Sequence, residues 1–356
     1  MSTGMRVLVL GATGFLGGHL TRLLRAERGI LPCTAGRGSG ADLRADLAAV
    51  TVPELAALLT AAAPDAVVNC AGAVGGGPGE QSALNSRLPA VLCAALKQAA
   101  PGARLVHLGS AAEYGRVPHG ERVREEAPAA PLGHYGATKL AGTLAVTSSG
   151  ADAVVLRVTN PVGAGAPEAG LPGRLAAALR RAAVTGPGTA VRVGDLSAHR
   201  DFVDVRDVAR AVHLALRAPG PLPGVVNIGS GEAVRVRELA TALLAIAGSG
   251  VRLREEAGGG SARSGQVDWS CADVTRAATA LGWRPRHSLT DSLTALWEEN
   301  GRETVGTDRD GKERATVRAA RAEAARAGGP GGGSAAGLLV PRTPLAASPA
   351  PAEEPV

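Results

Sequence analysis

The stretch "RVLVLGATGFLGG", residues 6–18, decides the fold. A short apolar run predicts a buried strand, and the apolar spacing that follows it predicts a helix. Between them, Gly11, Gly14 and Gly17 have the spacing of a dinucleotide-binding turn. The first glycine permits a tight turn, the second lets the backbone approach a pyrophosphate, and the third lets helix and strand pack closely. The N-terminus of the helix then offers free N–H groups to phosphate.

Strand and helix patterns alternate through the first half of the chain. The predicted strands are apolar along their whole length, which is typical of a parallel sheet covered by helices on both faces. We therefore expect an α/β fold with a Rossmann-type doubly wound sheet. The further strands are predicted at 65–72, 104–110 and 153–160, and the helices between them at 53–63, 86–99 and 135–147.

The pattern changes after residue 160, where loops lengthen and Gly and Pro cluster. We expect residues 1–160 to form mainly the dinucleotide-binding domain, with parts of 200–230 returning to its sheet. Residues 161–300 are expected to form mainly a smaller substrate-binding domain. Residues 301–356 combine a charged stretch with a Gly/Pro/Ala-rich segment, a composition that predicts a disordered tail.

Composition excludes several classes of protein. The net charge of +6 is spread out without a basic stripe, so we expect no nucleic-acid partner. No apolar stretch reaches 18 residues, so we expect no membrane span. No charged leader precedes a long apolar run, so we expect no signal peptide. The cysteines show no metal-type spacing, which predicts reduced, buried thiols in a cytoplasmic protein without a metal site. They are Cys33, Cys70, Cys93 and Cys271.

The end of the second strand selects between the two nicotinamide dinucleotides. An acidic side chain there accepts a hydrogen bond from a ribose hydroxyl, whereas an arginine favours a 2′-phosphate. The stretch "LPCTAGRGSGADLRADL" (31–47) offers Arg37 between glycines and no acidic residue before Asp42. We therefore expect NADP(H) to be favoured, with NAD(H) as the alternative. Arg37 can also be interpreted as a solvated loop arginine.

A serine and a tyrosine–lysine pair indicate the chemistry. Tyr135 and Lys139 are four residues apart in "YGATK" (135–139), so a helix places them on one face. A nearby ammonium lowers the pKa of a tyrosine, which can then exchange a proton with an alcohol or carbonyl. Ser110 stands at the carboxyl end of a predicted strand, where open parallel sheets bind ligands. We expect Ser110, Tyr135 and Lys139 to be catalytic.

The chain resembles the extended short-chain dehydrogenase/reductases, the nucleotide-sugar epimerases, dehydratases and ketoreductases. The resemblance covers roughly residues 5–300 and rests on motifs in the family's order. These motifs are "GATGFLGG" (11–18), "NCAG" (69–72), "GSAAEYG" (109–115), "YGATK", "LRVTNPVG" (156–163), "RDFVDVRDVARA" (200–211), "NIGSG" (227–231) and "LGWRP" (281–285).

This resemblance implies roles for individual residues. Ser110, Tyr135 and Lys139 match the catalytic triad, and the lysine also holds the nicotinamide ribose. Asn160, Arg200 and Arg263 match groups that bind the diphosphate, phosphates or ribose of a sugar nucleotide, although the arginines can also be interpreted as plain surface charge. The positions that match cofactor contacts are Gly11, Thr13, Gly14, Phe15, Leu16, Gly17, Asp46, Leu47, Ala71 and Gly72, besides Tyr135 and Lys139.

Three further positions have mixed interpretations. Asn85 matches a family asparagine near the active site, but it also suits the start of a helix. Asp204 and Asp207 are expected to cap a helix rather than to take part in chemistry. The family pattern also implies a homodimer formed through helices of the sheet domain.

Two alanines narrow the reaction. The family's 4,6-dehydratases carry an Asp–Glu pair after the catalytic hydroxyl residue, and here Ala111 and Ala112 stand in those positions. Alanine cannot act as an acid or base, so dehydration is not expected. Glu113 follows one position later, and strand alternation would turn its side chain elsewhere.

Two reactions need only the serine, tyrosine and lysine. The first is reduction of a nucleotide-diphospho-4-keto-6-deoxy sugar, and the second is 4-epimerisation of a nucleotide sugar with tightly bound NAD. Arg37 favours reduction. A reductase of non-sugar carbonyls and a non-catalytic NAD(P)-binding protein are two further hypotheses. The complete triad argues against the latter, and Asn160, Arg200 and Arg263 favour a substrate that carries a diphosphate.

Overall fold

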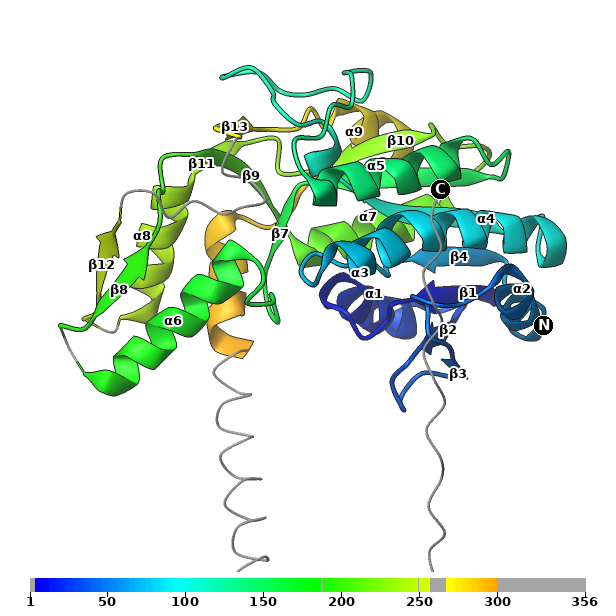
Figure 1. Ribbon diagram of the computed structural model, residues 1–356, viewed down its shortest axis with the longest axis horizontal. Coiled ribbons are helices and arrows are strands. Elements are labelled where there is room, and N and C mark those ends of the chain that lie inside the picture. The colour runs from blue at the N-terminus through cyan, green and yellow to red at the C-terminus, as the bar shows by residue number, and fades with distance from the viewer. Residues whose placement is uncertain (1–3, 187, 249, 257–266, 300–356) are drawn as a thin grey trace, which may run out of the picture. The chain divides into compact units, whose positions relative to one another are not determined.

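The protein is described by a computed structural model that covers residues 4–186, 188–248, 250–256 and 267–299 (Figure 1). Its centre is a seven-stranded parallel sheet in the order β10-β6-β5-β4-β1-β2-β3. This confirms the predicted α/β class and Rossmann-type sheet. The strands are β1 (Met5–Leu10), β2 (Ile30–Gly36), β3 (Leu43–Arg44), β4 (Ala66–Asn69), β5 (Arg104–Ser110), β6 (Ala153–Val158) and β10 (Val225–Ile228).

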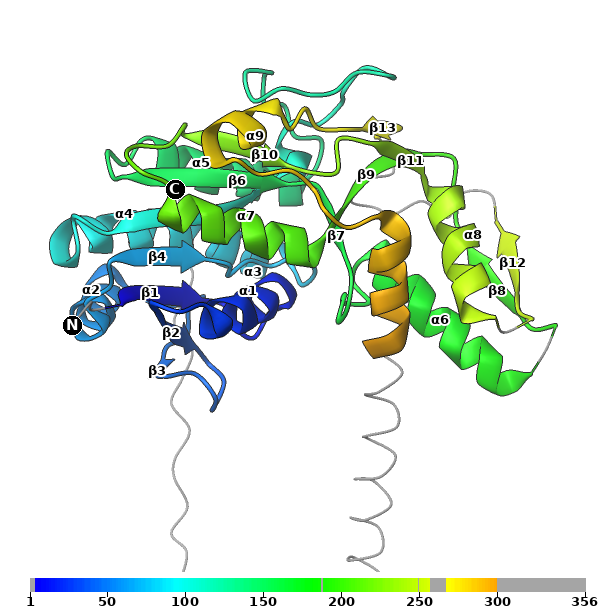
Figure 2. The same cartoon turned by 180° about the vertical axis from the view of Figure 1, so that it is seen from behind.

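Helices cover both faces of this sheet, as the apolar strands predict. Two separate clusters of buried aliphatic side chains lie between the sheet and its helices. One face packs against α1 (Phe15–Ala26), α7 (Val205–Arg217) and α9 (Thr275–Leu281), and Figure 2 shows α7 in front of it. The other face packs against α2 (Val52–Ala62), α4 (Leu88–Ala99) and α5 (His134–Thr147). Three short turns complete this part: α3 (Pro78–Ser82), the π-turn η1 (Ala83–Arg87) and the 3₁₀ turn η2 (Ala111–Glu113).

A second group of elements comes from the chain beyond residue 159. It has its own cluster of buried apolar side chains and two small sheets. The strands are β7 (Asn160–Val162), β8 (Ala190–Val193), β9 (His199–Asp204), β11 (Ala233–Arg235), β12 (Arg252–Glu255) and β13 (Trp269–Ser270). The helices are α6 (Leu171–Thr185), α8 (Val236–Ala247) and a helical segment over 289–299. Its substrate-binding role stays a prediction, and the predicted tail, 301–356, lies outside the described residues.

The chain leaves the central sheet one residue after β6. The predicted strand over 153–160 breaks at Thr159, whose N–H still donates to the Ile228 carbonyl of β10. Asn160 then pairs with Phe202 in the second group of strands. Because one continuous segment serves both sheets, the carboxyl edge of the central sheet lies directly beside the second group.

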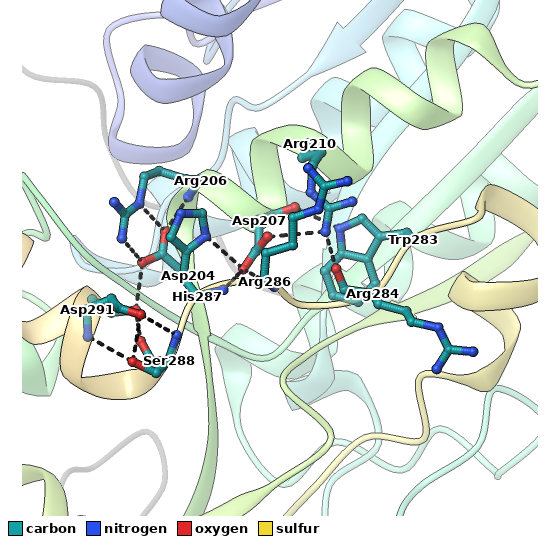
Figure 3. A network of polar contacts seen from close by, with 11 residues as sticks. Asp204, Arg206, Asp207, Arg210, Trp283, Arg284, Arg286, His287, Ser288 and Asp291 are labelled. Carbon is teal, nitrogen blue, oxygen red and sulfur yellow. Dashed lines mark hydrogen bonds and ion pairs between the residues drawn. The ribbon is translucent and has the colours of Figure 1, made fainter.

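A buried polar network fastens α7 to the segment 283–292 (Figure 3). Asp204 caps α7 by accepting from the Arg206 N–H, and it also accepts from the Ser292 hydroxyl. Asp207 lies inside α7 and accepts from the N–H groups of Arg286 and His287. The expectation that both carboxylates cap a helix is therefore right for Asp204 and wrong for Asp207. The buried Asp207 instead holds the returning chain.

Two expectations from composition have different outcomes. All four cysteines are free thiols, but only Cys271 is buried, and the other three are half-buried. The prediction of buried thiols is therefore wrong for Cys33, Cys70 and Cys93, because each of these residues keeps part of its surface accessible to solvent. Among the described helices, none is long and apolar enough to cross a membrane.

We predict that Asp204→Asn destabilises the fold in a pH-dependent way. Burial raises the pKa of Asp204, but bonds from Arg206 and Ser292 outweigh it and leave the pKa below its ordinary value. The stabilisation is thus fully present above the unfolded-state pKa of about 4, and it is lost as the pH falls below that value through the lower folded-state pKa. Asparagine still caps the helix, but it removes the charge that bonds Arg206 and Ser292. The free energy of unfolding, measured in denaturant at neutral pH, should therefore fall by about 2 kcal/mol.

The matched control is Glu168→Gln, which removes an ion pair between two exposed side chains. Its cost should stay below about 1 kcal/mol at any pH. A loss in Asp204→Asn that persists undiminished in acid would contradict the assignment, since the effect would then not depend on the charge of Asp204.

Candidate active site

The glycine turn after β1 has the geometry that its sequence predicts. Gly11 adopts a positive φ of 76°, and a Cβ atom there would lie 2.7 Å from the backbone of Ala71. A Cβ on Gly17 would lie 2.1 Å from the Gly11 carbonyl oxygen, so this glycine lets α1 pack against the turn. Gly14 is exposed, and the atom nearest to a Cβ built on it would be the Gly11 carbonyl oxygen, at 3.4 Å. The surface at Gly14 is therefore open to a ligand.

The N-terminus of α1 fits an anionic group. Its N-cap residue, Gly14, provides no side chain to bind the first N–H groups, and the first turn contains no acidic residue. Thr13 is exposed beside the turn, while Phe15 and Leu16 are partly buried under it. The open N–H groups and the positive end of the helix dipole match a dinucleotide pyrophosphate. The residues present therefore fit a bound nicotinamide dinucleotide.

Residues after β2 bear on the adenosine half of such a cofactor. Arg37 is exposed directly after the strand. Asp42, the first acidic residue beyond it, accepts from the N–H and hydroxyl of Thr34, and these bonds hold the pKa of Asp42 below its ordinary value. Asp46 accepts from the Ala48 N–H at a turn before α2. Leu47 is buried in the core rather than exposed to solvent, and a cofactor contact of either residue stays a prediction.

The serine, tyrosine and lysine come from elements that touch one another. Ser110 is the last residue of β5, and its hydroxyl accepts from the Ala112 N–H. Lys139 is buried in α5 and its ammonium donates to the Leu108 carbonyl of the same strand, at 2.7 Å. Burial lowers the pKa of Lys139, and this is partly opposed by the charge of Glu113.

Tyr135 lies one helical turn before Lys139 and is half-buried. The next residue, Gly136, brings this end of α5 against η2, because a Cβ atom there would lie 2.5 Å from the Ala112 carbonyl oxygen. The start of α5 thus meets the turn that follows Ser110. The structure brings the three predicted catalytic residues to one edge of the central sheet.

The segment after β4 closes the site from the other side. Gly72 is placed so that a Cβ atom would lie 3.3 Å from the ammonium nitrogen of Lys139 and 3.1 Å from the amide oxygen of Asn85. Asn85 bonds both the N–H and the carbonyl of Ala73, and also the Thr138 hydroxyl in α5. Asn85 therefore lies near the active site, inside the π-turn η1, and it does not start a helix.

The predicted substrate residues have partners within the chain. The Asn160 amide donates to the Asp201 carbonyl. The buried guanidinium of Arg200 donates to the carbonyls of His199 and Val267, and burial lowers the pKa of Arg200. Arg263 lies outside the described residues. A diphosphate contact for these three residues stays a prediction.

Glu113 is a site residue whose role the sequence did not reveal. Its side chain does turn away from the Ala111–Ala112 positions, as expected, but a 3₁₀ turn rather than strand alternation directs it. It is completely buried and accepts from the Ser110 N–H. Among the described residues, no group of His, Cys, Asp or Glu side chains is arranged to hold a metal ion.

A dinucleotide-type glycine turn beside a serine, a tyrosine and a buried lysine defines a nicotinamide-dependent oxidoreductase of the short-chain type. The family model described as "NAD dependent epimerase/dehydratase family" matches residues 7–229. The chain belongs to this family and is thus an NAD(P)-dependent oxidoreductase or epimerase of the extended short-chain dehydrogenase/reductase type.

Individual relatives match nearly their whole length. A dTDP-6-deoxy-L-talose 4-dehydrogenase (NAD(P)(+)) of Kitasatospora kifunensis is 40% identical over 82% of this chain and 94% of its own. A UDP-glucose 4-epimerase of Azospirillum brasilense is 30% identical over 85% of this chain and 94% of its own. The structure of RMD from Pseudomonas aeruginosa complexed with NADPH has a TM-score of 0.72 and 25% identity, covering 83% of this chain and 98% of that chain.

We predict that substitutions of two glycines separate cofactor binding from folding. Gly14→Ala should fold with an unchanged melting temperature but bind NADPH at least tenfold more weakly, because the methyl group obstructs the approach of a pyrophosphate. Gly17→Ala should instead lower the melting temperature, since its Cβ would lie 2.1 Å from the Gly11 oxygen. Nicotinamide fluorescence and thermal unfolding measure the two effects.

Gly18→Ala is the matched control in the same helix, where a Cβ would meet nothing closer than 3.7 Å. It should alter neither the affinity for NADPH nor the melting temperature. Wild-type affinity in Gly14→Ala would refute the proposed cofactor turn.

Proposed function

We propose that the protein is an NAD(P)-dependent reductase of a nucleotide-diphospho-4-keto-6-deoxy sugar, acting reversibly as a 4-dehydrogenase. The observation that carries the proposal is the meeting of Ser110 with the Tyr135–Lys139 helix at the carboxyl edge of the sheet, beside the glycine turn. The 40% identity to a dTDP-6-deoxy-L-talose 4-dehydrogenase supports this choice of substrate. Both comparisons with nucleotide-sugar enzymes support the broader class.

Each residue has one task in this reaction. A bound nicotinamide dinucleotide supplies the hydride for C4 of the sugar. The Ser110 hydroxyl orients the keto oxygen, and Tyr135 donates a proton to that oxygen as negative charge develops on it. The positive charge of Lys139 stabilises the resulting phenolate. In the oxidative direction the phenolate removes the same proton from the C4 hydroxyl group.

The turn after β5 supports reduction over dehydration. Ala111 and Ala112 form the 3₁₀ turn beside Ser110, and neither can transfer a proton. The carboxylate of Glu113, which follows them, is fully buried and bonded to Arg157 and Thr143. No described residue of this turn thus offers a carboxyl group to remove water from a sugar ring.

We propose NADP(H) as the preferred cofactor. Arg37 is exposed directly after β2, where a guanidinium suits a 2′-phosphate. Asp42 is bonded to Thr34, which favours a structural role for the first acidic residue beyond that strand. NAD(H) remains the alternative, and the name of the Kitasatospora relative covers both forms.

A nucleotide-sugar 4-epimerase is the second candidate. The same triad serves epimerisation, and 30% identity to a UDP-glucose 4-epimerase over 85% of the chain favours it specifically. An epimerase would retain NAD through purification, whereas a reductase exchanges it at each turnover. Relatives that act on nucleotide sugars weigh against a non-sugar carbonyl reductase, and the assembled triad weighs against a non-catalytic binding protein.

A homodimer formed by helices of the central sheet is part of the proposal. α4 and α5 lie side by side on one face of that sheet (Figure 1). Leu144 of α5 is 57% exposed, so a partner helix packed on this face would cover it. We expect Leu144→Glu to shift the mass measured by light scattering from dimer to monomer.

We predict that Tyr135→Phe folds and binds NADPH with wild-type affinity but loses at least a thousandfold in kcat. The phenyl ring keeps the packing and removes the proton donor. The measurement is NADPH absorbance in the presence of a thymidine-diphospho-4-keto-6-deoxyhexose. Tyr114→Phe is the matched control, because this buried hydroxyl bonds Asn227 and not the substrate. Wild-type turnover by Tyr135→Phe would remove the catalytic assignment.

We predict that Arg37→Ala lowers kcat/KM for NADPH at least tenfold and leaves that for NADH unchanged, because the lost guanidinium would contact only the 2′-phosphate. Arg44→Ala, at an exposed arginine of the neighbouring β3, should change neither value. Equal losses with both cofactors would show that Arg37 does not discriminate between them.

A further inference from the structure

Glu113 joins three elements of the active site. One carboxylate oxygen accepts from the Ser110 N–H at 2.7 Å. The other accepts from the Thr143 hydroxyl at 2.8 Å and from the Arg157 guanidinium at 2.7 Å. Thr143 lies one helical turn after Lys139, and Arg157 belongs to the adjacent strand β6. A single side chain therefore connects the strand of the catalytic serine to the helix of the catalytic tyrosine and lysine.

The strand β5 is shaped to receive this carboxylate. A Cβ atom on Gly109 would lie 2.8 Å from the Glu113 oxygen and 2.7 Å from the Val155 side chain. Only glycine thus leaves room for the buried carboxylate. The Leu108 carbonyl, one residue before Gly109, accepts from Lys139, and the Ser110 N–H, one residue after it, donates to Glu113. The two charged groups are anchored to the same three residues.

Arg157 forms a buried ion pair with Glu113. The guanidinium is itself only 6% exposed in its side chain, and it lies over the Tyr114 ring with its central carbon 4.5 Å from the ring centroid. The charge of Glu113 raises the pKa of Arg157, against the effect of burial. The Tyr114 hydroxyl is held by Asn227 of β10. The contacts around this pair therefore connect β5, β6 and β10.

The charge of Glu113 also acts on the buried ammonium of Lys139, whose pKa it raises against the effect of burial. Two other titratable groups that face Lys139 are neutral, because burial raises the pKa of Cys70 to about 12 and lowers the pKa of His107 well below its ordinary value. Of the groups that raise the pKa of Lys139 against the effect of burial, Glu113 has the largest influence. The other titratable side chains on these elements, and on α5 itself, are Glu80, Arg87, Cys93, Lys97, Arg104, His134, Tyr135 and Arg157.

We propose that Glu113 is a positioning residue of the reaction: it fixes Ser110 relative to α5 and places a carboxylate in the same buried network as the Lys139 ammonium. The inference rests on the proposed function, in which that ammonium stabilises the phenolate of Tyr135. A purely structural capping residue would need only a hydrogen-bond acceptor at this position. The proposal instead requires a carboxylate, and an amide of the same shape distinguishes the two roles.

The first experiment measures the ionisation of Tyr135 without substrate. The chain has only two tyrosines, and burial raises the pKa of Tyr114, so the transition at lower pH in ultraviolet difference absorbance belongs to Tyr135. Its disappearance in Tyr135→Phe secures the assignment. In Glu113→Gln the midpoint should rise by about one pH unit, because a less charged Lys139 stabilises phenolate less well.

Matched variants separate charge from geometry. Glu113→Asp keeps the charge but shortens the reach, so it should preserve the midpoint and lower kcat for the keto sugar by roughly ten- to hundredfold. Thr143→Val removes one uncharged bond and should likewise leave the midpoint unchanged. Thr147→Val, one turn further along α5 and bonded only to helix carbonyls, should alter neither quantity.

The outcomes discriminate between the proposals. An unchanged Tyr135 midpoint in a folded Glu113→Gln protein overturns the role of Glu113. If this single variant does not fold, the double variant Glu113→Gln with Arg157→Met removes both buried charges, and its midpoint must still rise. In a further outcome, the wild-type protein shows no turnover with the keto sugar while the midpoint rises in Glu113→Gln. That result rejects the proposed substrate and retains the role of Glu113.

Discussion

The burial of one ammonium group, that of Lys139, shapes the centre of this protein. Removing a cation from water is costly unless hydrogen bonds and opposite charge replace its hydration. The Leu108 carbonyl and the carboxylate of Glu113 provide these. Burying Glu113 in turn requires Arg157, and the space for its carboxylate requires Gly109. Each group that compensates a buried charge comes from a further element of the structure. These contacts therefore hold β5, η2, α5 and β6 in one arrangement.

The parallel sheet determines where this buried charge can act. The strands β1, β4 and β5 run side by side in the same direction, so Gly11, Gly72 and Ser110 follow their strands at one edge. Burial of Lys139 beneath that edge puts Tyr135, one turn earlier, at the boundary between protein and solvent. A phenol at this boundary is accessible to a substrate, whereas the Lys139 ammonium below it is shielded from water. This shielding strengthens the electrostatic interaction between the ammonium and the phenol.

Local patterns were sufficient for the sheet, the glycine turn and the placement of Tyr135 and Lys139 on one helix, because each depends on residues close in sequence. "RVLVLGATGFLGG" and "YGATK" contain within themselves the spacing that their geometry needs. The contacts of Glu113 were not predictable, since Thr143 and Arg157 are 30 and 44 residues away. Asp207 was misassigned as a helix cap for the same reason: its partners, Arg286 and His287, are about eighty residues further along the chain.

The contacts divide the molecule into a part that sets the chemistry and a part that can vary. The hydrogen bonds that hold Ser110, Lys139 and Glu113 come from residues between 108 and 157. The second group of strands is tied to the central sheet elsewhere, through Asp201 at the 230–231 turn and through Asp207 on α7. In the proposed assignment, changes on the surface of this second group alter which sugar nucleotide is held without disturbing the proton chemistry. The fold alone therefore does not fix the substrate, which depends on the residues that line the site.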